Sequence, residues 1–154
     1  MLSRIAESLY WIGRYNERAD ATARVLDVHL QRDQDDLGKE MGFGGLLAAM
    51  GVEPPPRQLT ASDVVELLAY DPDSPSSITA ALQSARENAR GAREIVSAEL
   101  WETLNVTWHG VGERRAAAAV LGPHVFFKYV RERTAMATGI ISTTMVRDDG
   151  WKFL

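Results

Sequence analysis

The sequence contains no cysteine among its 154 residues. This absence excludes disulfide bonds, thiolate metal sites and a cysteine nucleophile, and it is compatible with the reducing cytosol. No apolar run is long enough to span a bilayer, and charged residues interrupt the hydrophobic N-terminal segment at Arg4, Glu7 and Arg14. We therefore expect neither a transmembrane helix nor a signal peptide, and we predict a cytoplasmic protein without a membrane partner.

The sequence also lacks an excess of basic residues, because its formal net charge is −4. Domains that bind nucleic acid usually carry a broad basic surface, so we expect no nucleic-acid partner. Apolar residues make up 45% and charged residues 25% of the chain, which is ordinary globular composition. A chain of this length predicts one folded domain with a substantial core.

The motifs of common metal and hydrolase sites are missing as well. A di-iron helical bundle needs Glu-x-x-His pairs, but the residues three positions before the three histidines are Leu26, Val106 and Leu121. No nucleophile elbow supports a Ser-His-Asp hydrolase, whereas the 21 acidic residues leave too many combinations to exclude a carboxylate pair. We predict no metal ion and no cofactor, and no residue is assigned a catalytic role.

Apolar residues of the first segment recur at steps of three, four and seven, which predicts a helix from about Ser3 to about Leu30. Ser3 is of a type that caps helix N-termini. The composition then changes to polar residues, glycine and proline, and we predict a flexible connection over 31–58. Within it, LLAAM at 46–50 could form one or two helical turns.

Further helices are predicted in the second part of the chain. TASD at 60–63 is similar to a capping box, and Ser76 or Ser77 is expected to cap the next helix. The apolar phase of that helix slips near Ser97, so one kinked helix or two consecutive helices fit the pattern. Gly122-Pro123 begins the last long helix, and MVRDDGWKFL at 145–154 is typical of another helix start.

No segment predicts a strand, so the expected fold class is an all-α bundle of five or six helices. The helix after Gly122-Pro123 is apolar nearly all round, which is typical of a helix that is central in its bundle or covered by a partner. Both interpretations stay open at this point, and another copy of the chain that completes the bundle is one form that such a partner takes. The side of the first helix that carries Trp11, Tyr15 and Val25 is a second apolar surface, for another element or a partner chain.

Two polar residues, Asn16 and Asp20, fall within the apolar stripe of the first helix. Burying such groups costs several kcal/mol unless they are hydrogen-bonded or paired. The segment ARENARGAR at 85–93 carries arginines beside its own apolar seam. We therefore predict an ion pair between the two segments, joining Glu17 or Asp20 to Arg86 or Arg93.

These groups define one candidate polar cluster, with two interpretations. The cluster would fix the register of the helices, or it would bind an anionic or amide ligand, because the planar guanidinium of arginine suits carboxylates and phosphates. Its members are Arg14, Asn16, Glu17, Arg18, Asp20, Arg24, Arg86, Asn88, Arg90 and Arg93.

Four ordered blocks of the chain resemble the bacterial alpha-E family, a predominantly helical domain of unknown function. The blocks are MLSRIAESLYWIGRYNERADATARVLDV at 1–28, YDPDSPSSI at 70–78, ARENARGAREIVSAELWETLN at 85–105 and TGIISTTMVRDDGWKFL at 138–154. In the family, the RDDGW-type block opens a second half with another G-R-x-x-E-R-A pattern, like residues 13–19 here. The resemblance implies that this single domain, 1–154, corresponds to an N-terminal half, as a short member or a fragment.

The resemblance also implies a functional context. Alpha-E proteins are typically encoded beside, or fused to, circularly permuted ATP-grasp ligases, often with transglutaminase-like proteins. It implies a helical accessory domain of a peptide ligase or peptide-modification system, which binds the ligase, a transglutaminase-like partner or a peptide substrate. Two alternatives stay open, an enzyme acting on peptides or amides through Glu17, Asp20 and Arg86, and a structural self-assembling bundle. A homo-oligomer is expected.

Overall fold

The computed structural model describes residues 2–34 and 42–144, and within these ranges the chain forms helices and no strand. The elements are α1 (Leu2–Gln34), α2 (Phe43–Ala49), α3 (Ala61–Val65), the π-helix η1 (Glu66–Tyr70), α4 (Ile78–Gly91), α5 (Ala98–Leu121) and α6 (His124–Thr144). The all-α prediction is confirmed. The helix start predicted at 145–154 lies outside the described residues.

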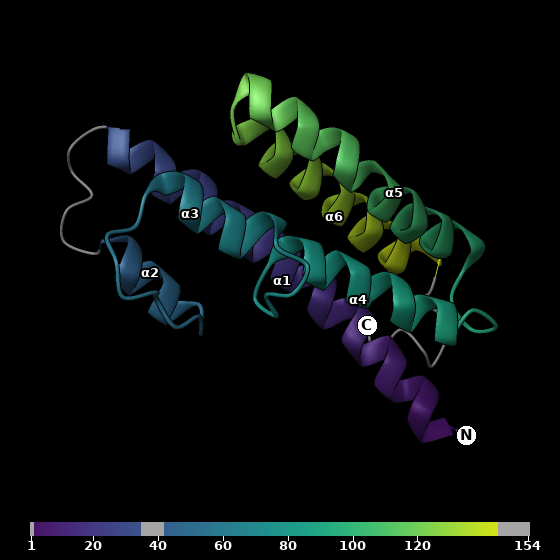
Figure 1. Cartoon of the computed structure of the whole chain (residues 1–154). Helices are drawn as coiled ribbons and strands as arrows, with labels where there is room; N and C mark the ends of the chain where they lie inside the picture. The colour runs from purple at the N-terminus through teal and green to yellow at the C-terminus, as the bar shows by residue number, and fades with distance from the viewer. Residues whose placement is uncertain (1, 35–41, 145–154) are drawn as a thin grey trace.

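Four long helices form the body of the molecule (Figure 1). Helix α1 packs along α4 and α6, and α5 packs along the same two helices from the other side, so that the four helices close into a bundle. The short elements α2, α3 and η1 pack near the C-terminal part of α1. None of the described helices is both long enough and apolar enough to cross a membrane.

The region predicted as a flexible connection is partly helical. Helix α1 continues to Gln34, beyond the predicted end at Leu30, and α2 occupies 43–49. Leu46 and Leu47 of α2 are buried in the core, which explains why a short glycine-rich helix holds its place. The predicted turns at 46–50 are therefore confirmed, and tertiary burial rather than local propensity stabilises them.

Serine side chains set the start of two helices; the cap at Ser77 is confirmed, whereas the cap at Ser97 was not predicted. The Ser77 hydroxyl accepts a hydrogen bond from the Ala80 amide at 3.0 Å, and the Ser97 hydroxyl accepts one from the Leu100 amide at 3.2 Å. Because Ser97 caps a new helix, the phase slip resolves as two consecutive helices, α4 and α5, rather than one kinked helix.

A full capping box starts α3. The Thr60 hydroxyl accepts from the Asp63 amide, and the Asp63 carboxylate accepts from the Thr60 amide at 2.8 Å. Arg57 also donates to both carboxylate oxygens, at 2.9 and 2.7 Å. These bonds hold the pKa of Asp63 well below its usual range, because they favour the ionised carboxylate. The hydrogen bond from Arg57 has the largest effect.

The hydrophobic core consists of two clusters, one toward each end of the bundle. The first contains Leu26, Leu47, Leu68, Phe126 and Phe127 among others, and the second contains Leu9, Ile12, Leu100, Leu104 and Ile141 among others. Three buried polar residues separate them along the helices: Asn16 on α1, Thr107 on α5 and Thr134 on α6. We call these three residues the polar layer.

The polar layer continues into α5 and α6 through long side chains. Arg133 donates from Nε to the Thr107 hydroxyl at 2.9 Å, and the Tyr129 hydroxyl donates to the Thr107 carbonyl at 2.9 Å. A Cβ added to Gly110 would overlap the Tyr129 hydroxyl, so this glycine provides the space for the tyrosine. Burial raises the pKa of Tyr129, and its hydroxyl therefore stays protonated as a donor at neutral pH.

Helix α6 is only partly covered. Its buried face carries Phe126, Phe127 and Val130, whereas Met136 on the other side is exposed and Lys128 and Glu132 form a solvent-exposed pair. The helix is therefore not central in the bundle, although it is apolar in composition. Its coverage by another copy stays a prediction.

We predict opposite effects for two glycine substitutions in α5. Gly110→Ala should lower the free energy of unfolding by about 1–2 kcal/mol, because the new methyl group displaces Tyr129 from Thr107. Gly112→Ala is the matched control; with nothing near its Cβ position, it should raise stability by up to about 1 kcal/mol through helix propensity. Urea unfolding measures both, and equal effects of the two substitutions would contradict the role of Gly110.

Acid should remove the contribution of Asp63. Its lowered pKa stabilises the fold above the unfolded pKa, about 4, and this contribution is lost as the pH falls toward the folded pKa. Asp63→Asn should therefore lower Tm at pH 7, and the difference from wild type should shrink between about pH 4 and pH 2. Asp73→Asn, in the exposed turn, should leave Tm unchanged. A pH-independent difference would contradict the charge-assisted cap.

Candidate functional site

The ten residues of the predicted polar cluster do not meet at one place. The structure divides them into three groups. Arg14, Glu17, Arg18 and Arg24 lie on the solvent side of α1, Asn16 and Asp20 lie at or beside the α1–α6 contact, and Arg86, Asn88, Arg90 and Arg93 belong to the C-terminal half of α4 and the turn after it. No single ligand site contains all of them.

The predicted ion pairs between α1 and the 85–93 segment are wrong. Glu17 pairs with Arg14 of its own helix at 2.6 Å, and the two side chains are 68% and 52% exposed. Asp20 accepts from Nε of Arg24, also on α1, at 2.7 Å. The reason is geometric, because partners three or four residues away on the same helix lie within reach without any tertiary contact. Such exposed pairs add little stability.

The prediction that Asn16 points inward is confirmed, but its partner is α6 rather than α4. Asn16 is 6% exposed, and its amide nitrogen donates to the Thr134 carbonyl and the Thr138 hydroxyl, each at 3.2 Å. The Thr134 hydroxyl in turn donates to Asp20 at 3.2 Å. These bonds fix the register of α1 against α6. A role in helix register was one of the two interpretations of the cluster, but it was expected between α1 and the 85–93 segment.

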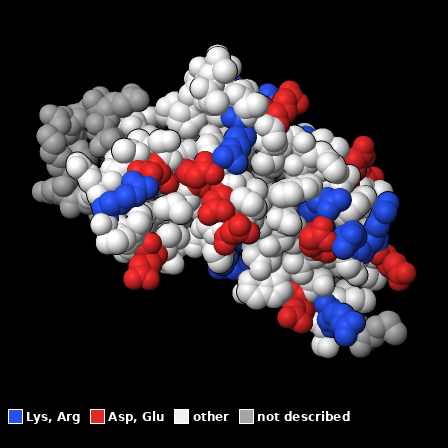
Figure 2. Space-filling model, in the orientation of Figure 1, with Lys and Arg blue, Asp and Glu red and all other residues white. Residues whose placement is uncertain are grey.

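The arginines of α4 are held by α5 and by one shared carboxylate. Arg86 donates from Nε to the Asn105 side chain at 2.8 Å and pairs with Glu87 at 2.6 Å, while Arg90 pairs with the same Glu87 at 2.9 Å. Figure 2 shows positive and negative side chains side by side near the C-terminal end of α4. Arg86 and Arg90 therefore both contact a carboxylate, although the single Glu87 balances only one of their two positive charges.

A tryptophan organises the same region. The guanidinium groups of Arg93 and Arg86 lie 4.9 and 5.8 Å from the centre of the Trp101 ring, within the range of cation–π attraction. Asn88 takes no part, since its side chain donates to the Ser84 carbonyl one turn earlier. Trp101 was not among the predicted site residues, because an isolated tryptophan in a helical pattern predicts core packing.

The solvent side of α1 is a continuous mixed surface. We call it the outer face of α1, and its exposed residues are Tyr10, Arg14, Glu17, Arg18, Ala21, Arg24, Val25 and Val28. Beside it, Trp11 and Tyr15 stack with ring centres 5.4 Å apart, and the Arg18 guanidinium lies 5.6 Å from the Tyr15 ring. The second apolar surface predicted for the first helix is thus present, although charged side chains interleave with it.

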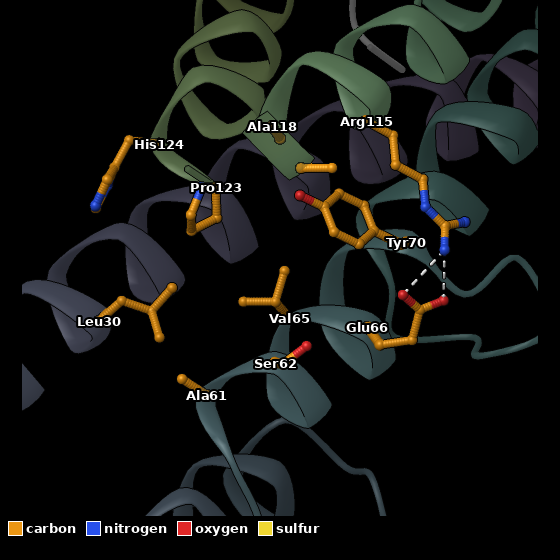
Figure 3. Close-up of a pocket in the computed structure, with 11 residues that line it drawn as sticks. Leu30, Ala61, Ser62, Val65, Glu66, Tyr70, Arg115, Ala118, Pro123 and His124 are labelled. Atoms are coloured by element: carbon orange, nitrogen blue, oxygen red, sulfur yellow. Dashed lines mark hydrogen bonds and ion pairs between the residues drawn. The ribbon is translucent and has the colours of Figure 1, made fainter. Parts of the chain in front are cut away.

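Sequence reasoning missed a separate hollow in the described part of the chain. It has a volume of about 530 Å³ and lies between the ends of α1, α5 and α6 and the α3–η1 segment (Figure 3). Its polar residues include Glu66, Tyr70, Arg115 and His124. Glu66 and Tyr70 lie far from Arg115 and His124 in the sequence, and the four belong to no motif, so no pattern in the sequence indicated that they meet.

The edge of this hollow is tied to α1 by a histidine. Nδ1 of His124, the first residue of α6, lies 2.6 Å from a carboxylate oxygen of Asp27. The other oxygen of Asp27 is 3.5 Å from Arg131. Asp27 therefore bridges two residues of α6, and the contact holds α1 and α6 together at the hollow.

Substituting Asn16 tests its role in the α1–α6 contact. Asn16→Ala should lower the free energy of unfolding by about 1–3 kcal/mol, through two lost hydrogen bonds and a small cavity. Asn16→Asp keeps the size but turns a carboxylate oxygen toward the Thr134 carbonyl, and it should cost at least as much at pH 7. Asn88→Ala, which removes a bond within one helix, should cost less. Denaturant unfolding measures all three, and a neutral Asn16→Ala would refute the register role.

Comparison with known proteins identifies relatives of unknown function. An uncharacterised protein of Mycobacterium bovis and its counterparts in two strains of Mycobacterium tuberculosis are each 25% identical to this chain over 175 residues. The similarity covers 98% of this chain but only 20% of each relative, so the chain spans about a fifth of their length. No solved structure matches the chain.

The whole chain, residues 1–154, matches the Alpha-E family, described as a predicted alpha-helical domain with a conserved ER motif. Adjacent Glu and Arg residues occur at Glu17-Arg18 on the outer face of α1, and also at 113–114 and 132–133. The helical bundle observed here agrees with that description. The chain therefore belongs to the Alpha-E family.

Proposed function

We propose that this chain is a helical interaction domain of an ATP-grasp-type peptide ligase or peptide-modification system, and that it binds the ligase through the outer face of α1. The observation that carries the proposal is the make-up of this face, where Tyr10 is 48% exposed among arginines. The link to the ligase rests on the resemblance of the sequence blocks. Because ligation by such enzymes consumes ATP, the proposal places the domain in the cytoplasm.

The side chains of the outer face are those that contribute most to protein–protein binding. Tyrosine, tryptophan and arginine are enriched where single substitutions cost most affinity. Tyr10, Arg14 and Arg18 lie on the outer face, with the stacked Trp11 and Tyr15 beside them. Helices α4 and α6 support α1 from behind, so that binding orders little additional backbone.

The charged side chains of the outer face can contact a partner. The Arg14–Glu17 pair is solvent-exposed, so its exchange for a partner's charged groups costs little. We assign the family's ER motif to Glu17-Arg18, because these residues lie within the G-R-x-x-E-R-A pattern of residues 13–19. An exposed motif of this type supports contact with a partner rather than packing of the core.

The structure bears differently on the two alternative functions, an enzyme and a self-assembling bundle. Glu17, Asp20 and Arg86 lie in separate groups, so their positions do not support an enzyme that uses them together. Two exposed apolar residues at the end of α5, Val120 and Leu121, support self-association, with exposures of 84% and 71%. We propose that a homo-oligomer forms through the end of α5 and leaves the outer face of α1 for the ligase.

Calorimetric titration with the ATP-grasp-type ligase of the same genome tests the proposal. The double substitution Tyr10→Ala with Arg18→Glu should weaken binding at least about tenfold, the loss expected for one removed binding hot spot. The control is a double variant that combines Val106→Ala on α5 with Lys128→Glu on α6. Both positions are exposed and lie outside the outer face, so this variant should leave Kd unchanged. Absence of wild-type binding at micromolar concentration, or equal losses in both variants, would reject the outer face as the binding surface.

A further inference from the structure

The hollow beside η1 has the dimensions and lining of a small-molecule site. Its volume of about 530 Å³ lies within the range of pockets that bury small ligands. Leu30, Val65, Ala118 and Pro123 provide apolar walls from four different elements or their ends. Figure 3 shows these side chains around the space, with Tyr70 at its side.

An unusual backbone brings two polar residues to this space. Glu66 and Tyr70 are the first and last residues of the π-helix η1, whose closing bond runs from the Asp71 amide to the Glu66 carbonyl at 2.8 Å. π-Helical turns are rare, and they occur frequently at functional sites. Here the wider turn places both Glu66 and Tyr70 in the lining of the hollow.

Contacts of its ring hold Tyr70 in place, but its hydroxyl has no hydrogen-bond partner among the described residues. Its ring makes an edge contact with Phe126, with centres 4.9 Å apart, and the Arg115 guanidinium lies 5.0 Å from its centre. Burial raises the pKa of Tyr70, and no hydrogen bond joins its hydroxyl to the described residues. Figure 3 shows this hydroxyl directed toward Pro123, across the hollow. A protonated hydroxyl is therefore available to a ligand.

Arg115 and Glu66, which line the hollow, neutralise each other. Arg115 donates from one nitrogen, Nη2, to both oxygens of Glu66, each at 3.0 Å. The pair carries no net charge, and the remaining ionisable side chain of the lining other than Tyr70, His124, lies against the Asp27 carboxylate, so neither offers an unpaired charge to an ionic ligand. Mostly apolar walls with a few placed polar groups are typical of sites for uncharged ligands.

We propose that this hollow binds a small uncharged molecule with an apolar body and a carbonyl oxygen, which accepts a hydrogen bond from the Tyr70 hydroxyl. The neutral Arg115–Glu66 pair closes one side and disfavours ions. The apolar walls bury the body of the ligand. This site is independent of the outer face of α1, since none of its lining residues belongs to that face.

Benzamide titration followed by two-dimensional amide NMR tests the site. Benzamide joins a flat apolar ring to a carbonyl, and benzoate and benzylammonium are charged analogues of nearly the same shape. We expect benzamide to shift the amide signals around Val65, Tyr70 and Ala118, and both ions to bind at least fivefold more weakly. Benzoate or benzylammonium binding as tightly as benzamide would overturn the uncharged class, and no shift with benzamide would overturn the site.

Two substitutions, each with a matched control, separate the hydroxyl from the space. Tyr70→Phe should weaken benzamide about fivefold, the effect of one hydrogen bond, whereas Tyr129→Phe removes a hydroxyl outside the hollow and should not. Ala61→Phe should fill the hollow and weaken benzamide at least tenfold, whereas Ala116→Phe on the exposed side of α5 should not. Unchanged binding in Tyr70→Phe or in Ala61→Phe would overturn the proposal.

Discussion

The hydrogen bonds of the buried Asn16 amide to α6 constrain the whole bundle. A buried amide without a partner is costly, and the Thr134 carbonyl and the Thr138 hydroxyl satisfy it in one alignment of the two helices. A shift of α1 by one residue would turn Asn16 away from these oxygens. A single buried asparagine sets register in coiled coils in the same way, at some cost in stability.

The polar layer also explains why the core is divided. In each of α1, α5 and α6, apolar residues of one cluster precede the layer and those of the other cluster follow it. Each cluster could pack in several ways by itself, because apolar contacts are not directional. The layer joins them by directional bonds, and the Asp27–His124 contact repeats the α1–α6 connection farther along the helices. Both proposed surfaces depend on this arrangement, since α1 carries the outer face and both helices border the hollow.

The candidate site was predictable only in part. Helical periodicity was enough to show that Asn16 faces the interior, because the stripe is a property of one helix. Periodicity could not identify which helix contacts Asn16, since α1 packs against both α4 and α6. The arginines at 85–93 led to the prediction of an ionic contact with that segment. The charged residues pair with neighbours in the sequence instead, Glu17 with Arg14 and Arg86 with Glu87. The one contact between helices in this group joins Arg86 to the uncharged Asn105 of α5. Short-range pairing needs no further loss of chain entropy, which is why it prevails at exposed positions.

The sequence by itself determined the all-α class and most helix starts. Thr60, Ser77 and Ser97 act on amides three residues away, so their role is contained in the local sequence. Only the tertiary structure decided that Asn16 meets α6, that α2 is held by buried leucines, and that Tyr70 and Arg115 share one hollow. The physical reason is distance along the chain. Local hydrogen bonds follow from neighbouring residues, whereas contacts between remote helices depend on how all their faces pack at once.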